Sequence, residues 1–153
     1  MSISIRTPNE GDFFAWLGLY EGYAEVYQVA LTDEKALRLW TWLTDSGHTE
    51  NALVAVDETG ELAGLVHFHT FPRPLESTNG MFIDDLFVRP DDRHNGIGRA
   101  LIDAVFEAAA EHRCDTVRWL SAPDDTTARA LYDEVAQTSD LVMYDRALEP
   151  ANA

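Results

Sequence analysis

Lysine and cysteine are almost missing from this chain, and both shortages narrow what it can do. Lys35 is the single lysine, and 11 Lys and Arg residues face 27 Asp and Glu residues, so the formal net charge is −16 at pH 7. A surface of this charge repels phosphate backbones and anionic headgroups, so we expect no nucleic-acid partner and no membrane partner. The same charge would attract a small cation, although solubility in a salty cytoplasm explains it equally well.

The single cysteine, Cys114, cannot form an internal disulfide. No apolar run approaches the ~20 residues that a membrane-spanning helix needs. The first residues also lack the basic and apolar segments of a secretory signal, so a cytoplasmic protein is the simplest expectation. No linker, repeat or low-complexity stretch divides the 153 residues, which suits one domain over residues 1–153.

Hydrophobic periodicity changes along the first seventy residues. Alternation predicts a strand over residues 2–6, and apolar residues at steps of three and four predict a helix after Pro8. A second helix should begin after Thr32 as its N-cap. The β-rich runs 52–56 and 62–71, separated by a polar turn, then predict a hairpin.

His67 and His69 lie two residues apart in the second strand of this hairpin, so both should project from one face of the sheet. Because an imidazole has a reference pKa of ~6.5, either could act as a base or contact a substrate. A His-x-His pair can also bind a metal, but no third ligand is evident in the sequence, so we expect none. Two hydrogen-bonded sheet histidines are the commoner outcome.

Residues 81–101 form the most informative stretch. An apolar strand over 81–88 leads into a turn rich in Arg and Asp, and two glycines then open a long amphipathic helix. The first N–H groups of a helix lack intrahelical partners and attract anions, and glycine lets a ligand approach the backbone. The stretch therefore predicts an anion-binding turn, with positive charge from Arg89, Arg93, His94 and Arg99.

Two phosphate-binding motifs are excluded here. Leu101 occupies the place of the third glycine of a dinucleotide fingerprint, and no Gly-Lys-Ser/Thr is present. The plain alternative is an ordinary turn in which arginine pairs with Asp91 and Asp92.

Two motifs resemble those of the GNAT superfamily of acyl-CoA-dependent N-acetyltransferases. Arg93-His94-Asn95-Gly96-Ile97-Gly98 is similar to the pattern Arg/Gln-x-x-Gly-x-Gly/Ala, and residues 125–132 are similar to Asn-x-x-Ala-x-x-Leu-Tyr. The resemblance implies a GNAT fold of the α/β (α+β) class. We expect a mixed central sheet of six to seven strands, closed by a strand over Leu141–Leu148, with about four flanking helices. Acetyl-CoA as cosubstrate, no metal and a homodimer are further expectations.

The resemblance also implies which residues hold the cosubstrate. The central strand splays from its parallel neighbour in this family, and the pantetheine arm enters the gap while the turn holds the pyrophosphate. Asp125 replaces the family's Asn, so it can still cap a helix but lacks the amide donor. The expected cofactor-binding residues are Leu86, Phe87, Val88, Arg93, His94, Asn95, Gly96, Ile97, Gly98, Arg99 and Asp125.

Amide formation needs a base for the ammonium, a donor for the carbonyl oxygen and an acid for the thiolate. By resemblance, Tyr132 is the acid and a backbone N–H near Phe87 is the donor. The run 83–88 is similar to that of spermidine/spermine N-acetyltransferases, in which the first of two acids is the base. Asp84 is thus the candidate base, and Asp85 is its rival, on the opposite face unless a bulge intervenes. His67 or water stays open as an alternative.

The acidic strand and the net charge favour a small cationic amine, such as a polyamine, as the acceptor. The amine of a protein or peptide, an amino acid or an aminoglycoside is the alternative, and a non-catalytic acyl-CoA-binding or sensing module is a third hypothesis. In the fold that the resemblance implies, the first two helices cover the acceptor site. Aromatic residues on them that would line it are Tyr23, Tyr27, Trp40 and Trp42.

Overall fold

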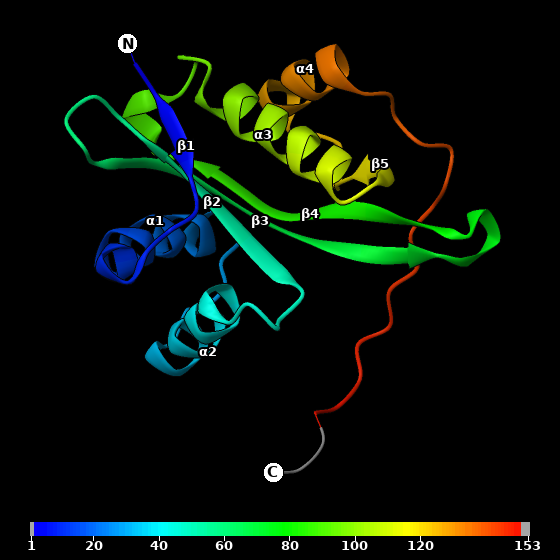
Figure 1. Cartoon of the computed structure of the whole chain (residues 1–153), viewed down its shortest axis with the longest axis horizontal. Helices are drawn as coiled ribbons and strands as arrows, with labels where there is room; N and C mark the ends of the chain where they lie inside the picture. The colour runs from blue at the N-terminus through cyan, green and yellow to red at the C-terminus, as the bar shows by residue number, and fades with distance from the viewer. Residues whose placement is uncertain (1, 151–153) are drawn as a thin grey trace. The chain divides into compact units, whose positions relative to one another are not determined.

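The structure, a computed structural model, describes residues 2–150 in two compact units that divide after Leu120. The first unit contains a five-stranded mixed sheet in the order β1-β2-β3-β4-β5 (Figure 1). Neighbouring strands are antiparallel from β1 to β4, and β4 and β5 are parallel. The strands are β1 (Ser4–Arg6), β2 (Glu50–Val56), β3 (Leu62–Arg73), β4 (Thr78–Val88) and β5 (Cys114–Arg118).

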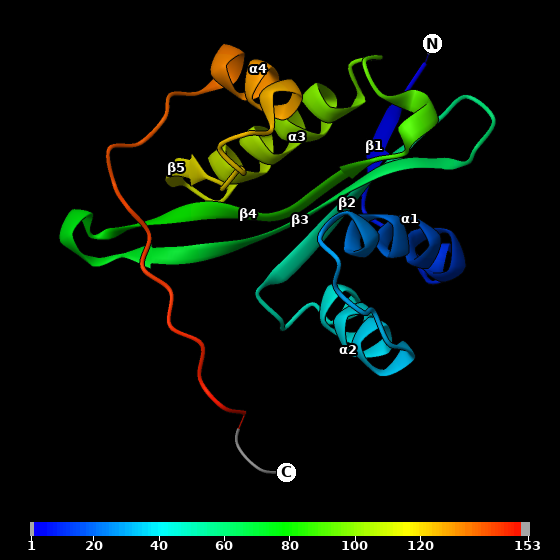
Figure 2. The same cartoon turned by 180° about the vertical axis from the view of Figure 1, so that it is seen from behind.

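Helices cover both faces of this sheet. Helices α1 (Phe13–Val26) and α2 (Asp33–Thr44) lie on one face, and α3 (Ile97–Glu111) lies on the other, as Figures 1 and 2 show from opposite sides. The predicted cap of α2 is confirmed, because the Thr32 side chain accepts a hydrogen bond from the Lys35 N–H. None of the helices within residues 2–150 is both long enough and apolar enough to cross a bilayer.

Each face of the sheet has its own core. Under α3, Met81 and Ile83 of β4 pack with Ile97, Leu101 and Val105 of the helix, all almost fully buried. The other cluster, under α1 and α2, is formed by Trp16, Leu19, Ala36, Val54, Val56, Leu62, Leu65 and Phe87. The side chains of β4 are therefore divided between two layers, and the strand is fixed from both sides.

The ladder between β3 and β4 is interrupted at Asp84. His67 pairs with Asp85 and Phe68 pairs with Ile83, so the residue between them has no partner on β3. One extra residue on one strand reverses the alternation of its side chains. Asp84 and Asp85 consequently project from the same face of the sheet, the face of α1 and α2, and the bulge that we considered for the two carboxylates is present.

The pairing of β4 with β5 ends early. Among the described residues, the last pair is Phe82 with Arg118, so the segment Ile83–Val88 pairs with β3 alone. In Figure 1, β4 continues well beyond the end of β5. The expected splaying of the central strand from its parallel neighbour is thus confirmed, and one edge of β4 presents backbone groups without a strand partner.

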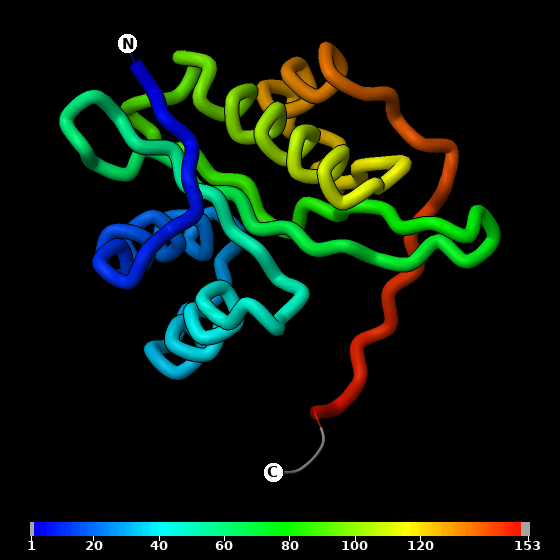
Figure 3. Tube along the Cα trace, in the orientation of Figure 1, coloured from blue at the N-terminus to red at the C-terminus, as the bar shows by residue number. Residues whose placement is uncertain are grey.

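The second unit contains α4 (Thr126–Val135), which begins at Asp125 as its N-cap. The predicted strand over Leu141–Leu148 is wrong: residues 136–150 form no helix or strand (Figure 3). An apolar stretch becomes a strand only where another strand pairs with it, and Leu141, Val142 and Tyr144 are largely exposed. The sheet of the described residues therefore has five strands instead of six or seven, with four α-helices as expected.

Candidate active site

Two histidine–carboxylate pairs lie side by side on the face of the sheet that α1 and α2 cover. His67 Nδ1 is 2.8 Å from Asp85 Oδ2, and His69 Nδ1 is 2.6 Å from Asp84 Oδ2. The strand period of β3 places both rings on one face, and the bulge in β4 places both carboxylates opposite them. Local backbone geometry thus gathers four titratable groups at one place.

The His67 pair is buried and fully hydrogen-bonded. The Trp16 indole N–H donates to His67 Nε2 at 3.0 Å, and the His67 ring is almost inaccessible to solvent. An indole nitrogen can only donate, so Nε2 accepts and the proton of the neutral ring is on Nδ1, facing Asp85. His67 therefore has no lone pair available for a substrate, and its role as a base is disfavoured.

Asp85 is the centre of a network that reaches α1. Its Oδ2 accepts from the Tyr20 hydroxyl at 2.9 Å as well as from His67. Burial raises the pKa of Asp85, but the hydrogen bonds from His67 and Tyr20 outweigh burial and hold the pKa below its ordinary value. Burial and the charge of Asp85 raise the pKa of Tyr20. Asp85 is thus a weakly basic carboxylate whose acceptor capacity is largely used.

The second pair is more open and has a third member. Glu50 of β2 pairs with His69 in the sheet, and its carboxylate is 3.6 Å from His69 Nδ1. Burial raises the pKa of Glu50 to about 9, and the neighbouring Asp84 adds to the effect. Within residues 2–150, one group of side chains could hold a metal ion: Glu50, His69 and Asp84. Their potential ligand atoms all lie within 4.8 Å of one another. A third possible ligand, which the sequence did not reveal, is therefore present beside His69. That the protein binds no metal stays a prediction.

Aromatic residues border these pairs. Tyr20 and Tyr23 stack with ring centroids 5.6 Å apart, and Tyr27 follows at 4.9 Å from Tyr23. Trp40 packs on Trp16 in the core, 5.0 Å between centroids. The exposed Trp42 instead stacks on His48. Of the four aromatic residues expected at the acceptor site, Tyr23 and Tyr27 thus belong to the tyrosine row that extends from Asp85.

The turn between β4 and α3 has the backbone form of an anion site. His94 and Gly96 adopt positive φ angles of 70° and 83°. Gly96 is the N-cap of α3, and no side chain caps this end of the helix. The first N–H groups of α3 are therefore available to a phosphate group, and a left-handed residue beside them adds to the concave array of donors. The residues present fit the pyrophosphate of the expected cosubstrate.

The four basic residues expected at this turn divide into two kinds. Arg89 is engaged by Asp92, by Asp57 at 3.0 Å and by Glu61 at 3.4 Å, and the bonds to Asp92 and Asp57 raise its pKa. The alternative of an arginine paired with a turn aspartate is therefore confirmed for Arg89 with Asp92. Arg93 is exposed; it donates from Nε to the Val88 carbonyl at 3.1 Å and lies 5.4 Å from the centre of the Phe87 ring. His94 and Arg99 are also exposed.

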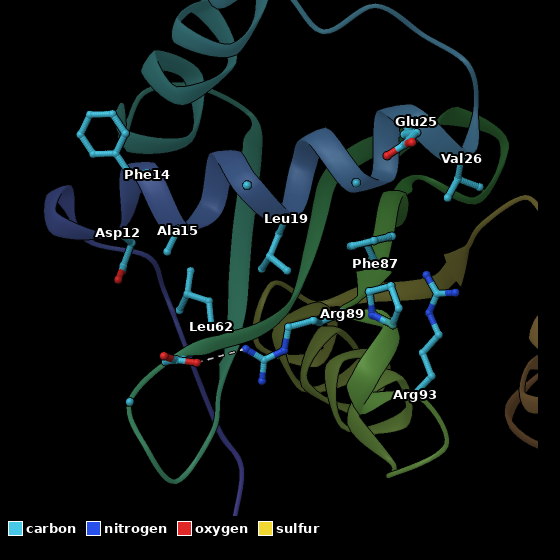
Figure 4. A pocket seen from close by; sticks show the side chains of 15 residues that line it. Asp12, Phe14, Ala15, Leu19, Glu25, Val26, Leu62, Phe87, Arg89 and Arg93 are labelled. Atoms are coloured by element: carbon cyan, nitrogen blue, oxygen red, sulfur yellow. Dashed lines mark hydrogen bonds and ion pairs between the residues drawn. The ribbon is translucent and has the colours of Figure 1, made fainter.

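A cavity of about 780 Å³ opens beside this turn, between α1 and the ends of β3 and β4 (Figure 4). Figure 4 shows the Arg93 side chain next to Phe87 at its rim. The volume is that of a small-molecule site. Its lining residues are Asp12, Phe14, Ala15, Gly18, Leu19, Gly22, Glu25, Val26, Gly60, Glu61, Leu62, Phe87, Arg89, Pro90 and Arg93.

The other expected residues are placed as follows. Leu86 and Val88 pack on the α3 side of β4, and Phe87 is buried on the α1 side, so only their backbone can face the splayed edge. Ile97 is a core residue of α3. Asp125 and Tyr132 belong to the second unit, where Asp125 accepts from the Ala128 N–H as a cap should. The catalytic role of Tyr132 and all cofactor contacts stay predictions.

Sequence reasoning missed Glu50, Trp16 and Tyr20 as members of the site. Glu50 stands at the start of β2, and its nearness to Asp84 depends on the register of two hairpins. Trp16 and Tyr20 belong to the apolar face of α1, and their i, i+4 spacing indicated only a packed face. The available signal was the polar atom that each buried aromatic ring carries, since such atoms need a partner.

Comparison with known proteins agrees with this geometry. The sequence model of the acetyltransferase (GNAT) family matches residues 16–136. The D-amino-acid N-acetyltransferase HPA3 of Saccharomyces cerevisiae is 27% identical over 145 residues, covering 94% of this chain and 90% of its own.

Two solved structures have the same fold. The ribosomal-protein-alanine N-acetyltransferase from Brucella melitensis biovar Abortus 2308 is 24% identical, with a TM-score of 0.80 over 97% of this chain and 100% of its own. AAC(6')-Iy, in complex with the bisubstrate analog CoA-S-monomethyl-acetylneamine, is 18% identical, with a TM-score of 0.83 over 97% of this chain and 99% of its own.

Proposed function

Because the chain belongs to the acetyltransferase (GNAT) family, we propose that it moves the acetyl group of acetyl-CoA to the primary amine of a small cationic acceptor, such as a polyamine. The observation that carries the choice of acceptor is the bulge at Asp84, which brings Asp84 and Asp85 to one face beside Glu50. The negative charges of Asp84 and Asp85 would stabilise an ammonium ion, and the net charge of −16 would attract it from a distance.

The β4–α3 turn supports acetyl-CoA as the donor. The N–H groups at the start of α3 and the exposed Arg93 would hold its phosphates, and the free edge of β4 near Phe87 would face its amide-rich arm. When bound, acetyl-CoA supplies an acetyl group already activated as a thioester. The chain itself must place the amine, remove its proton and exclude competing water.

Proton removal is proposed for the pair formed by Asp84 and His69. This pair is the more exposed of the two, with about a third of each side chain accessible, 32% for Asp84 and 31% for His69. Asp85 is the weaker candidate because it already accepts from His67 and Tyr20. Tyr132, which matches the end of the family's second motif, is proposed as the acid that protonates the departing thiolate.

A second acceptor class is an amino acid. One relative is named a D-amino-acid N-acetyltransferase. Arg118 pairs with Phe82 across β4 and β5 and so projects from the same face as His69, with its guanidinium 5.3 Å from the centre of the Phe71 ring. A guanidinium on this face could bind the carboxylate of an amino acid.

Thiol release from acetyl-CoA tests the proposal, measured across polyamines, arylalkylamines, D- and L-amino acids, aminoglycosides and peptides. We expect turnover with cationic amines, and loss of turnover with retained acetyl-CoA affinity in Tyr132→Phe. Turnover confined to amino acids, and reduced in Arg118→Gln, would favour the second class. Tight acetyl-CoA binding by calorimetry with every acceptor silent would favour a sensing module instead.

A further inference from the structure

The two histidine–carboxylate pairs have the same chemistry but different freedom. Both rings place Nδ1 against an aspartate, at 2.8 Å for His67 and 2.6 Å for His69. In His67 the other nitrogen is occupied by the Trp16 indole, and the ring is 1% exposed. A general base needs a free lone pair within reach of the substrate. The His67 pair fails this requirement. It therefore shows what a purely structural histidine–aspartate pair looks like in this protein, and the His69 pair can be compared with it.

His69 meets the requirement that His67 fails. Its Nδ1 faces two carboxyl groups, Asp84 at 2.6 Å and Glu50 at 3.6 Å, which favours a proton on that nitrogen. The lone pair of the neutral ring is then on Nε2. Among residues 2–150, no side chain or backbone group forms a hydrogen bond with Nε2, and the side chain is 31% exposed. The Phe82 ring lies 5.8 Å away between centroids, tilted by 37° to the imidazole.

We propose that His69 Nε2 is the atom that takes the proton from the acceptor ammonium, with Asp84 as the positioning residue that fixes its tautomer. The assignment rests on the proposed function. It replaces Asp84 as the base with a histidine that Asp84 orients, an arrangement in which the carboxylate also stabilises the imidazolium as it forms. Glu50 is the third member, and its raised pKa of about 9 leaves it protonated at neutral pH, so that one negative charge faces the ring.

The proton balance of the step is complete. The acceptor ammonium gives one proton to His69 Nε2, and the freed nitrogen lone pair forms the C–N bond as the thioester C–S bond breaks. The sulfur leaves with the bonding electron pair and takes a proton from the proposed acid Tyr132, and the second proton that the nitrogen loses restores the Tyr132 hydroxyl. His69 then returns its proton to water through its exposed edge. No oxidant, reductant or metal is required.

The charged and titratable groups on the His69 face come from three strands and one helix, with Arg118 projecting from β5. Glu50 projects from β2, Asp84 and Asp85 from β4, and Tyr20 of α1 donates to Asp85.

Thiol release and ring NMR on the full chain test the assignment together. His69→Gln should lower kcat/KM by about 100-fold or more, the usual contribution of a general base. Asp84→Asn should lower it as well, because the amide N–H can face Nδ1 and reverse the tautomer. His112→Gln, which changes an exposed histidine at the end of α3, is the matched control and should leave turnover unchanged.

Added imidazole should partly restore His69→Ala, which a merely structural histidine would not allow. Imidazole nitrogen shifts should show a proton on Nδ1 and none on Nε2 in neutral His69. Undiminished kcat/KM in His69→Gln, or the opposite tautomer, would overturn the assignment while leaving the proposed function intact. A native protein silent with every amine would overturn the proposed function and the assignment with it.

Discussion

Asp85→Asn measures how much the negative charge of Asp85, at the centre of the buried network, contributes to the free energy of unfolding. The carboxylate accepts from His67 Nδ1 at 2.8 Å and from the Tyr20 hydroxyl at 2.9 Å, and its side chain is 18% exposed. An asparagine keeps the shape, and its oxygen can still accept from His67, but both bonds lose charge assistance. A bond to a charged group contributes about 1.5–3 kcal/mol and a neutral one about 1, so we expect a loss of about 2 kcal/mol in the free energy of unfolding.

Urea denaturation at several pH values measures this loss. Because the folded pKa of Asp85 lies below its ordinary value, its stabilising contribution is complete above an unfolded pKa of about 3.9 and is lost as the pH falls through the folded value. The native protein and Asp85→Asn should therefore differ by a constant amount between about pH 4 and pH 7, and converge only as the pH falls below about 4 through the folded pKa. Asp85→Ala, which removes the acceptor of His67 and Tyr20 altogether, should cost more than Asp85→Asn at pH 7. Equal stability of the native and asparagine proteins at pH 7, or a difference that persists at low pH, would refute the network.

Other parts of the structure give three further predictions. Trp16→Phe removes the indole N–H that donates to the buried His67, so it should lower the free energy of unfolding, measured by urea denaturation, by about 1–2 kcal/mol. A change near zero would mean that this hydrogen bond does not stabilise the fold. Gly96→Ala puts a side chain on a residue with a φ of 83° and should destabilise the fold by about 1 kcal/mol and weaken acetyl-CoA binding in calorimetry; unchanged values of both would contradict the turn geometry. A chelator should leave thiol release unaltered, and loss of activity that Zn²⁺ restores would show that Glu50, His69 and Asp84 hold a metal.

Local signals predicted the elements that local chemistry determines. Thr32 caps α2, and the glycine at position 96 adopts the left-handed conformation that opens α3. The period of the apolar residues gave both helices of the first face and the helix of the other. These features depend on neighbours within one turn of the chain, so a single sequence contains enough information for them.

Features that depend on pairing between distant segments could not be predicted in the same way. The bulge at Asp84 became visible only through the register of β3 with β4, and Glu50 reaches His69 only through the register of β2 with β3. The strand expected over Leu141–Leu148 was wrong for the same reason, because its apolar pattern says nothing about whether a partner strand is present. The roles of the individual carboxylates could therefore be assigned only once the pairing of the strands was known. The family could be recognised from the sequence motifs alone.

The most direct test of the cationic acceptor is a competition between a diamine and the ω-amino acid of equal length for acetyl-CoA in one reaction mixture. Mass spectrometry of the two acetylated products gives the ratio of their kcat/KM values. We expect the diamine to be acetylated preferentially at low ionic strength, and the preference to decline as added salt screens the acidic face. Equal acetylation of both amines, or preference for the amino acid, would contradict it.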